Sequence, residues 1–148
     1  MFEKLQSRIP PGEPDLKIGR LSLWVPGYTW INQVNQGDYA YLKTPTLLEA
    51  ENIIFFSAGS ETPGFTFKKF LTDITVMYDT ISIEQVAELA SDESEFSLKL
   101  TNDLGQIAID IEYRGWSLDG RFEFKDKIDQ SYLPEIIKDL KLIIAKFA

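Results

Sequence analysis

The sequence of 148 residues contains no cysteine and no histidine. Without cysteine the chain can form no disulfide and has no thiolate nucleophile. Without histidine it lacks the most common general base, so Ser-His and Cys-His mechanisms within one chain are excluded. The two absences together exclude zinc sites built on thiolate or imidazole ligands. A composition free of cysteine fits a reducing compartment, and we expect a cytoplasmic protein.

Long apolar runs are also missing. No stretch approaches the roughly 18 apolar residues that a membrane-spanning helix needs, so we expect no membrane contact. Residues 1–15 contain Glu3 and three prolines and lack the apolar centre of a secretory signal, which predicts an irregular N-terminal segment. The length predicts a single domain over residues 1–148.

Basic residues are scarce in one part of the chain, and the net charge of −8 originates there. Residues 44–98 hold ten acidic residues and only two basic ones, whereas the rest of the chain is neutral. Such a balance disfavours binding to the phosphates of nucleic acid, which requires lysine and arginine. It favours a basic protein partner. The alternative is that the acids only keep the domain soluble.

The apolar periodicity predicts an α+β fold. Apolar residues recur at helical spacing over residues 67–81 and again over 132–147. Alternation predicts strands at 21–25, 28–34, 39–44, 86–90, 96–101, 107–114 and 121–125. Residues 47–56 read either as a bulged strand or as a short helix, with strand favoured, and 57–64 as a loop. We expect a two-layer domain: one antiparallel meander sheet of about six to eight strands with both helices on one face.

Carboxylates are the remaining candidates for chemistry. Asp110 and Glu112 share one strand face about 7 Å apart, a spacing that carboxylate-dependent hydrolysis could use but that many solvent-facing strands also show. Asp92, Glu93 and Glu95 match no calcium-binding loop. We therefore expect no catalytic residue, no metal and no cofactor, and a small carboxylate or Ser/Lys enzyme is the disfavoured alternative.

Binding is the favoured class of function. The candidate partner-binding residues are acids near the predicted 86–90 strand together with two tryptophans (Glu84, Glu88, Asp92, Glu93, Glu95, Trp24 and Trp116). In the strand 21–25, Trp24 points to the side opposite Leu23 and Val25, so we expect it on an open sheet face. Exposed aromatic residues on such a face are typical of binding hot spots. The alternative is that the N-terminal segment buries it.

A strand changes to a helix between Lys127 and Pro134. Ser131 is a good N-cap, and Pro134 fits the first turn because its missing N–H breaks no helical bond. Asp129 places negative charge near the positive end of the helix dipole. We interpret Asp129, Ser131 and Pro134 as a structural cap rather than a site.

The C-terminal half resembles a family of small bacterial immunity proteins of the WapI type. The resemblance covers about residues 65–147 and rests on four motifs: a Gly-x-Ile-x-Ile strand from Gly105, the Phe122-x-Phe124 strand, the run Asp129-Gln130-Ser131-Tyr132-Leu133, and a closing amphipathic helix. It implies a protein without catalytic activity that binds and blocks a toxin domain, often a basic nuclease. A structural or regulatory interaction domain is the alternative. The oligomeric state stays open, because an exposed edge strand could pair with a copy of itself.

Overall fold

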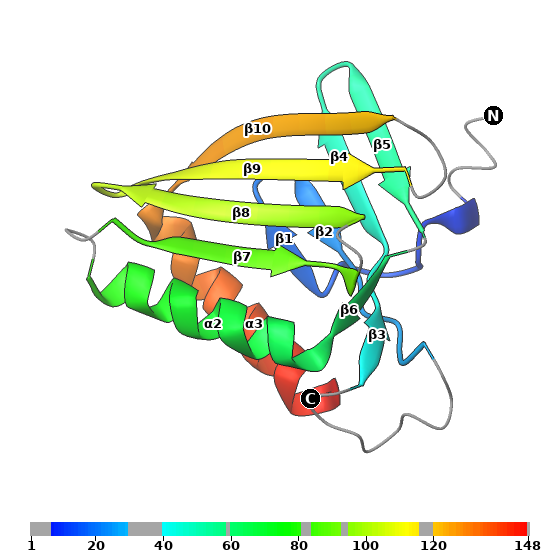
Figure 1. Ribbon diagram of the computed structural model, residues 1–148, viewed down its shortest axis with the longest axis horizontal. Coiled ribbons are helices and arrows are strands. Elements are labelled where there is room, and N and C mark those ends of the chain that lie inside the picture. Colours follow the sequence, from blue (N-terminus) through cyan, green and yellow to red (C-terminus); the bar gives the residue numbers. More distant parts are fainter. Residues whose placement is uncertain are drawn as a thin grey trace.

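The computed structural model describes residues 7–29, 40–58, 60–80, 84–92, 95–115 and 120–147 (Figure 1). Its helices are α2 (Gly64–Asp79), the short 3-10 helix η4 (Gln130–Tyr132) and α3 (Leu133–Phe147). Its strands are β1 (Leu16–Ile18), β2 (Leu21–Leu23), β3 (Tyr41–Lys43), β4 (Thr46–Ala50), β5 (Ile53–Ser57), β6 (Glu61–Pro63), β7 (Val86–Ala90), β8 (Phe96–Asp103), β9 (Gln106–Arg114) and β10 (Arg121–Asp129). The fold is α+β with antiparallel strands and two main helices, as the periodicity predicts.

The last four strands form an antiparallel meander in the order β10-β9-β8-β7. Along β9 every second residue is buried (Ile107, Ile109, Ile111 and Tyr113), which is the alternation that predicted the strand. The β8–β9 turn contains Leu104 and Gly105, both with positive φ, at 51° and 94°. Positive φ at both turn positions matches the right-handed twist of the strands, so this turn brings β8 and β9 together directly.

The expectation of one sheet is wrong, because the N-terminal strands form sheets of their own. One has the order β1-β2-β4-β5 and the other pairs β3 with β6. Residues 47–56 are neither a bulged strand nor a helix, since a turn at Glu51 and Asn52 folds them into the β4–β5 hairpin. The expected loop at 57–64 contains β6. Of the expected strand 28–34, Tyr28 and Thr29 are described, and Tyr28 forms an isolated bridge with Leu42.

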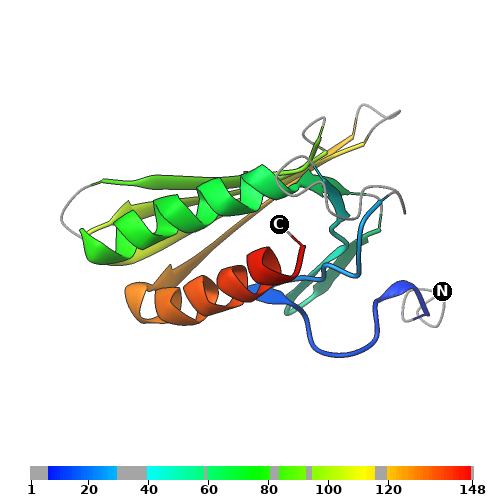
Figure 2. The same cartoon turned by 90° about the horizontal axis from the view of Figure 1, so that it is seen from below.

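The helices lie side by side and run in opposite directions (Figure 2). Helix α2 packs against β7 and α3, and α3 also packs against β1. A single core lies between the inner face of the β7–β10 sheet on one side and the apolar faces of the two helices and the β1-β2-β4-β5 sheet, here called the second sheet, on the other. The two sheets meet through Tyr113, whose hydroxyl lies 2.5 Å from that of Thr46 in the core, and through the stacked rings of Phe55 and Phe122, 4.7 Å apart. Helices and second sheet therefore cover only one face of β7–β10.

The strand-to-helix transition is present, but its cap lies two residues earlier than predicted. Asp129 ends β10 in an extended conformation, and its carboxylate accepts a hydrogen bond of 2.8 Å from the backbone N–H of Ser131. Ser131 lies inside η4, so the prediction that it is the N-cap is wrong. Pro134 is the second residue of α3, within the first turn, as expected. Tyr132 is 60% exposed and points away from the core.

Candidate functional site

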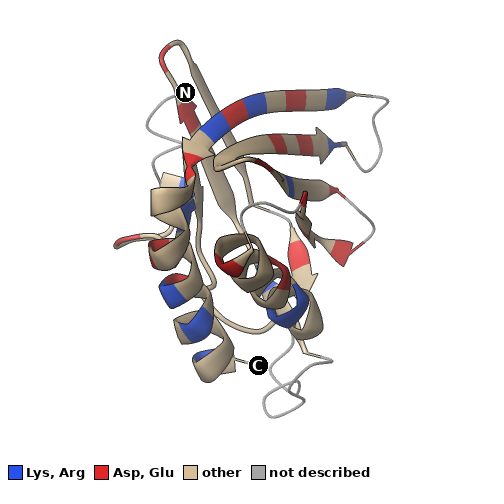
Figure 3. Cartoon of the chain, turned by 90° about the vertical axis from the view of Figure 1, so that its left-hand side faces the viewer, with Lys and Arg blue, Asp and Glu red and all other residues tan. Residues whose placement is uncertain are grey.

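Among the described elements, the helices and the other strands cover only the inner face of the β7–β10 sheet, and the outer face carries charged side chains from all four strands. Because side chains alternate along a strand, the residues between the buried ones all point to this side. We call it the open face and define it by Glu88, Ser97, Lys99, Asp110, Glu112, Arg114, Arg121, Glu123 and Lys125. Acidic and basic residues alternate along β10 (Figure 3).

One row of the open face alternates in charge across all four strands. The register sets Glu88 opposite Lys99, Lys99 opposite Asp110, and Asp110 opposite Lys125. The Lys125 ammonium donates to the Asp110 carboxylate at 3.0 Å, and this hydrogen bond raises the pKa of Lys125. Opposite charges facing each other across strands stabilise this sheet register.

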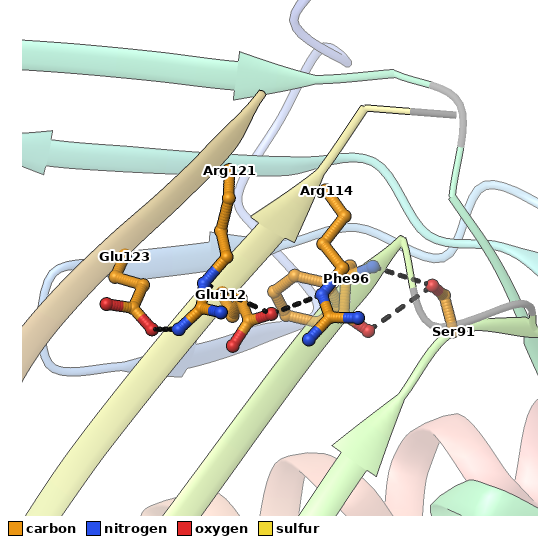
Figure 4. A network of polar contacts seen from close by, with 6 residues as sticks. All are labelled: Ser91, Phe96, Glu112, Arg114, Arg121 and Glu123. Carbon is orange, nitrogen blue, oxygen red and sulfur yellow. Dashed lines mark hydrogen bonds and ion pairs between the residues drawn. The ribbon is translucent and has the colours of Figure 1, made fainter. Parts of the chain in front are cut away.

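In the next row two carboxylates face each other, Glu112 on β9 and Glu123 on β10. Two arginines offset the repulsion (Figure 4). The Arg114 side chain donates to Glu112 at 2.5 Å, which lowers the pKa of Glu112. Arg121 donates to Glu123, which raises the pKa of Arg121, and its Nε lies 3.7 Å from Glu112. These four side chains form one exposed ion-pair network at the end of the sheet.

The arrangement argues against carboxylate catalysis. A general acid at neutral pH needs a raised pKa, whereas that of Glu112 is lowered by Arg114. Asp110 is engaged by Lys125. Among the described residues, no group of three or more acids is placed to hold a metal ion. What such a face can do is exchange its exposed ion pairs for new ones with a docked partner, because exposed pairs contribute little to stability.

The predicted acidic residues lie along strand β7, at the edge of the open face. Glu88 is exposed at the centre of the strand, while Glu84 and Asp92 are exposed just beyond its two ends. Glu95 is half-buried just before β8, and its carbonyl accepts a hydrogen bond of 2.8 Å from Arg114 N–H. We call these four residues the β7 acidic edge. Glu84, Glu88 and Asp92 follow one another along β7 and its flanks, and Glu95 lies beyond the turn that leads to β8, so the four residues are not a compact cluster.

The remaining predicted binding residues do not join this edge. Trp24 is only 6% exposed, so the expectation that it lies on an open face is wrong. Its indole N–H donates to the carbonyl of Gly12 at 3.3 Å, which shows that the N-terminal segment covers it. Glu93 and Trp116 lie outside the described residues.

Sequence reasoning missed the basic half of the open face, namely Lys99, Arg114, Arg121 and Lys125. The signal was present in the segment from Arg121 to Lys127, where charged residues alternate with Phe122 and Phe124. The inward phenylalanines imply that the charges share the opposite face. The face is therefore mixed in charge, and it is acidic only along β7.

Two of the hollows formed by the described residues lie beside the sheets. One, of about 600 Å³, lies between the β1–β2 turn, the end of β10 and α3, where Lys17, Arg20, Asp126 and Asp139 give it mixed charge. Burial, with a smaller contribution from Glu135, raises the pKa of Asp139. The other, of about 420 Å³, lies next to β5 and is lined by aromatic rings and two arginines. No helix among the described residues is long and apolar enough to cross a membrane.

The chain is thus a small α+β domain with a charged outer sheet face. Residues 28–148 match the immunity protein WapI-like family, and the chain belongs to that family. Immunity protein families are typically non-enzymatic, and the family match thus supports the expectation that this chain is not an enzyme. Searches of the curated proteins and of the solved structures give no match.

The family match confirms the resemblance and extends it. It begins at residue 28, whereas the sequence motifs indicated a start near residue 65. Both ends of the matched region touch in the fold: the Tyr28 hydroxyl donates to the carbonyl of Phe147 at 3.0 Å, and the two rings meet edge to face at 5.7 Å. Strands β3 to β6 are thus part of the region that matches the family, whereas β1 and β2 precede it.

Proposed function

We propose that the chain is an immunity protein that neutralises a basic toxin domain, such as a nuclease, by binding it through the open face and the β7 acidic edge. The observation that carries the proposal is the family match combined with one uncovered, charged sheet face. The absence of cysteine fits action in the reducing cytoplasm of the producing cell.

The charge distribution supports a basic partner. Glu88 is exposed on β7, Glu84 and Asp92 are exposed just beyond its two ends, and no basic residue occurs between Phe70 and Leu98 in the sequence. A line of like charges raises the encounter rate with a cationic surface and repels acidic proteins. The ion pairs further along the open face then offer both signs of charge for fixing the orientation of the partner.

The direct test is rescue from a toxin, and the proposal predicts that one is encoded beside the gene. The C-terminal toxin domain is expressed alone and together with this chain, and growth is followed. We expect growth to be restored and a stoichiometric complex to be isolated, whose affinity weakens as salt is raised. A toxin that kills equally with and without the chain, and does not bind it, would refute the proposal. Binding without rescue would instead favour an interaction domain that does not inhibit.

A further inference from the structure

Strand β5 is the only described edge strand that lacks protection against pairing. The described sheets have six edge strands, and five of them contain a charged residue (Lys17 in β1, Lys43 in β3, Glu61 in β6, Glu88 in β7, and several in β10). The sixth is β5, whose sequence Ile-Ile-Phe-Phe-Ser has no charge and no proline. Charged residues and proline are the usual means by which proteins keep edge strands from pairing with other chains.

The exposure of β5 fits a surface that is covered on association. Ile53 and Ile54 are 45% and 49% exposed although they point to opposite faces of the sheet. The inner side of β5 pairs with β4, and no other described strand pairs with its outer side. Since a strand directs the backbone groups of alternate residues outward, β5 offers unpaired N–H and C=O groups between two apolar side-chain rows.

We infer that β5 pairs antiparallel with β5 of a second copy of this chain, joining two four-stranded sheets into one of eight strands. The uncharged run is self-complementary, because an antiparallel copy places only apolar or small side chains opposite one another. The acidic surfaces of two copies repel each other, since each chain carries a net charge of −8. A contact between copies at the uncharged β5 avoids this repulsion, and a basic partner gains no charge pairing there.

The aromatic hollow next to β5 supplies further contact area. Phe55 lines it together with Tyr113 and Phe122, and the Phe55 ring stacks on Phe122 at 4.7 Å. Side chains from an added strand that point to the Phe55 side would lie over these rings. Five paired residues and this hollow bury less than the roughly 1,200 Å² of a standard interface, so we expect a dissociation constant on the order of 10–100 µM. The dimer is thus reversible.

The test is sedimentation velocity of the full chain over a concentration series. Wild type should shift from monomer to dimer, and added NaCl should strengthen the dimer because it screens the repulsion between the two acidic chains. Ile54→Lys, which places a charge on the exposed edge, should abolish the dimer. Leu142→Lys is the matched control, because it adds the same charge at an exposed aliphatic residue of α3. A wild type that stays monomeric at about 500 µM, well above the expected dissociation constant, or an Ile54→Lys variant that still dimerises, would overturn the inference.

A second readout keeps the test independent of how Ile54→Lys folds. The chain has no cysteine, so a single introduced thiol reports only on contact between copies. With all five residues of β5 paired, Ile54 of one copy lies opposite Phe56 of the other. Under mild oxidation an equimolar mixture of Ile54→Cys and Phe56→Cys chains should therefore form a disulfide-linked dimer, whereas Leu142→Cys should not, because a disulfide requires Cβ atoms about 4 Å apart. Equal cross-linking of this mixture and of Leu142→Cys would place the contact elsewhere and count against β5. Neither readout depends on the toxin.

Discussion

Replacing Tyr113 with phenylalanine should lower the stability of the domain at neutral pH and remove the part of its stability loss at high pH that comes from ionisation of Tyr113. The Tyr113 hydroxyl is buried and lies 2.5 Å from the hydroxyl of Thr46, across the junction of the two sheets. In Tyr113→Phe the Thr46 hydroxyl stays buried without this partner, at a cost of about 1–2 kcal/mol. Replacing both residues, in Tyr113→Phe with Thr46→Val, should recover most of the loss, because no unpaired hydroxyl then remains.

The pH dependence of the difference in stability follows from the burial of the Tyr113 hydroxyl. Burial raises the pKa of Tyr113 from 10.0 to about 12, although the bond with Thr46 acts in the opposite direction. The folded state therefore favours the neutral phenol of Tyr113. The stabilisation of the folded state by this phenol is complete below pH 10 and is lost as the pH rises towards 12. By pH 11, ionisation in the unfolded chain removes about 1.4 kcal/mol from wild type and nothing from Tyr113→Phe. The stability gap between the two proteins should close to about zero at that pH.

Urea denaturation of both proteins from pH 7 to pH 11 measures this gap directly. Tyr78→Phe is the control, because the Tyr78 ring is exposed on α2 and its loss should change the free energy of unfolding little. A gap between wild type and Tyr113→Phe that stays constant up to pH 11 would refute the reasoning, since it would mean that the phenol ionises equally in both states.

Two further predictions concern individual residues. Gly19→Ala should lower stability by at least about 1–2 kcal/mol, because Gly19 has φ of +57° and a Cβ there would lie 2.6 Å from the Asp126 carboxylate. Gly27→Ala, with open space around the new methyl group, should be nearly neutral by thermal denaturation, and an equal loss in both variants would contradict the argument. Arg114→Gln should raise the pKa of Glu112 towards its ordinary value in an NMR titration of the carboxyl groups, because the Arg114 hydrogen bond is the largest cause of its lowering. An unchanged Glu112 pKa would assign the lowering to another group.

Local patterns predicted the elements whose neighbours in space are also neighbours in sequence. The β8–β9 turn at Leu104 and Gly105 joins strands that pair directly, so the meander follows from alternation and turn residues. Both helices follow from their apolar spacing. The C-terminal half of the domain was therefore predictable in outline.

Pairings between distant segments could not be predicted from such patterns. Alternation identifies which side chains share a strand face, but it does not specify which strand lies alongside, so β2 pairing with β4 was not foreseen. Trp24 is buried through a contact with Gly12, in a segment whose composition indicates only irregular structure. Likewise, the network of Glu112, Arg114 and Arg121 depends on the register between β9 and β10.

The most direct test of the central claim compares two triple variants of equal net charge in binding the toxin domain. One reverses the three exposed residues of the β7 acidic edge (Glu84→Lys, Glu88→Lys and Asp92→Lys), and the other reverses three exposed acids elsewhere (Glu13→Lys, Glu51→Lys and Asp103→Lys). If the toxin docks on the open face, titration calorimetry should show affinity reduced roughly 10-fold or more for the first variant and much less for the second. Equal affinities for the two variants would contradict the account, because net charge rather than this surface would then govern binding.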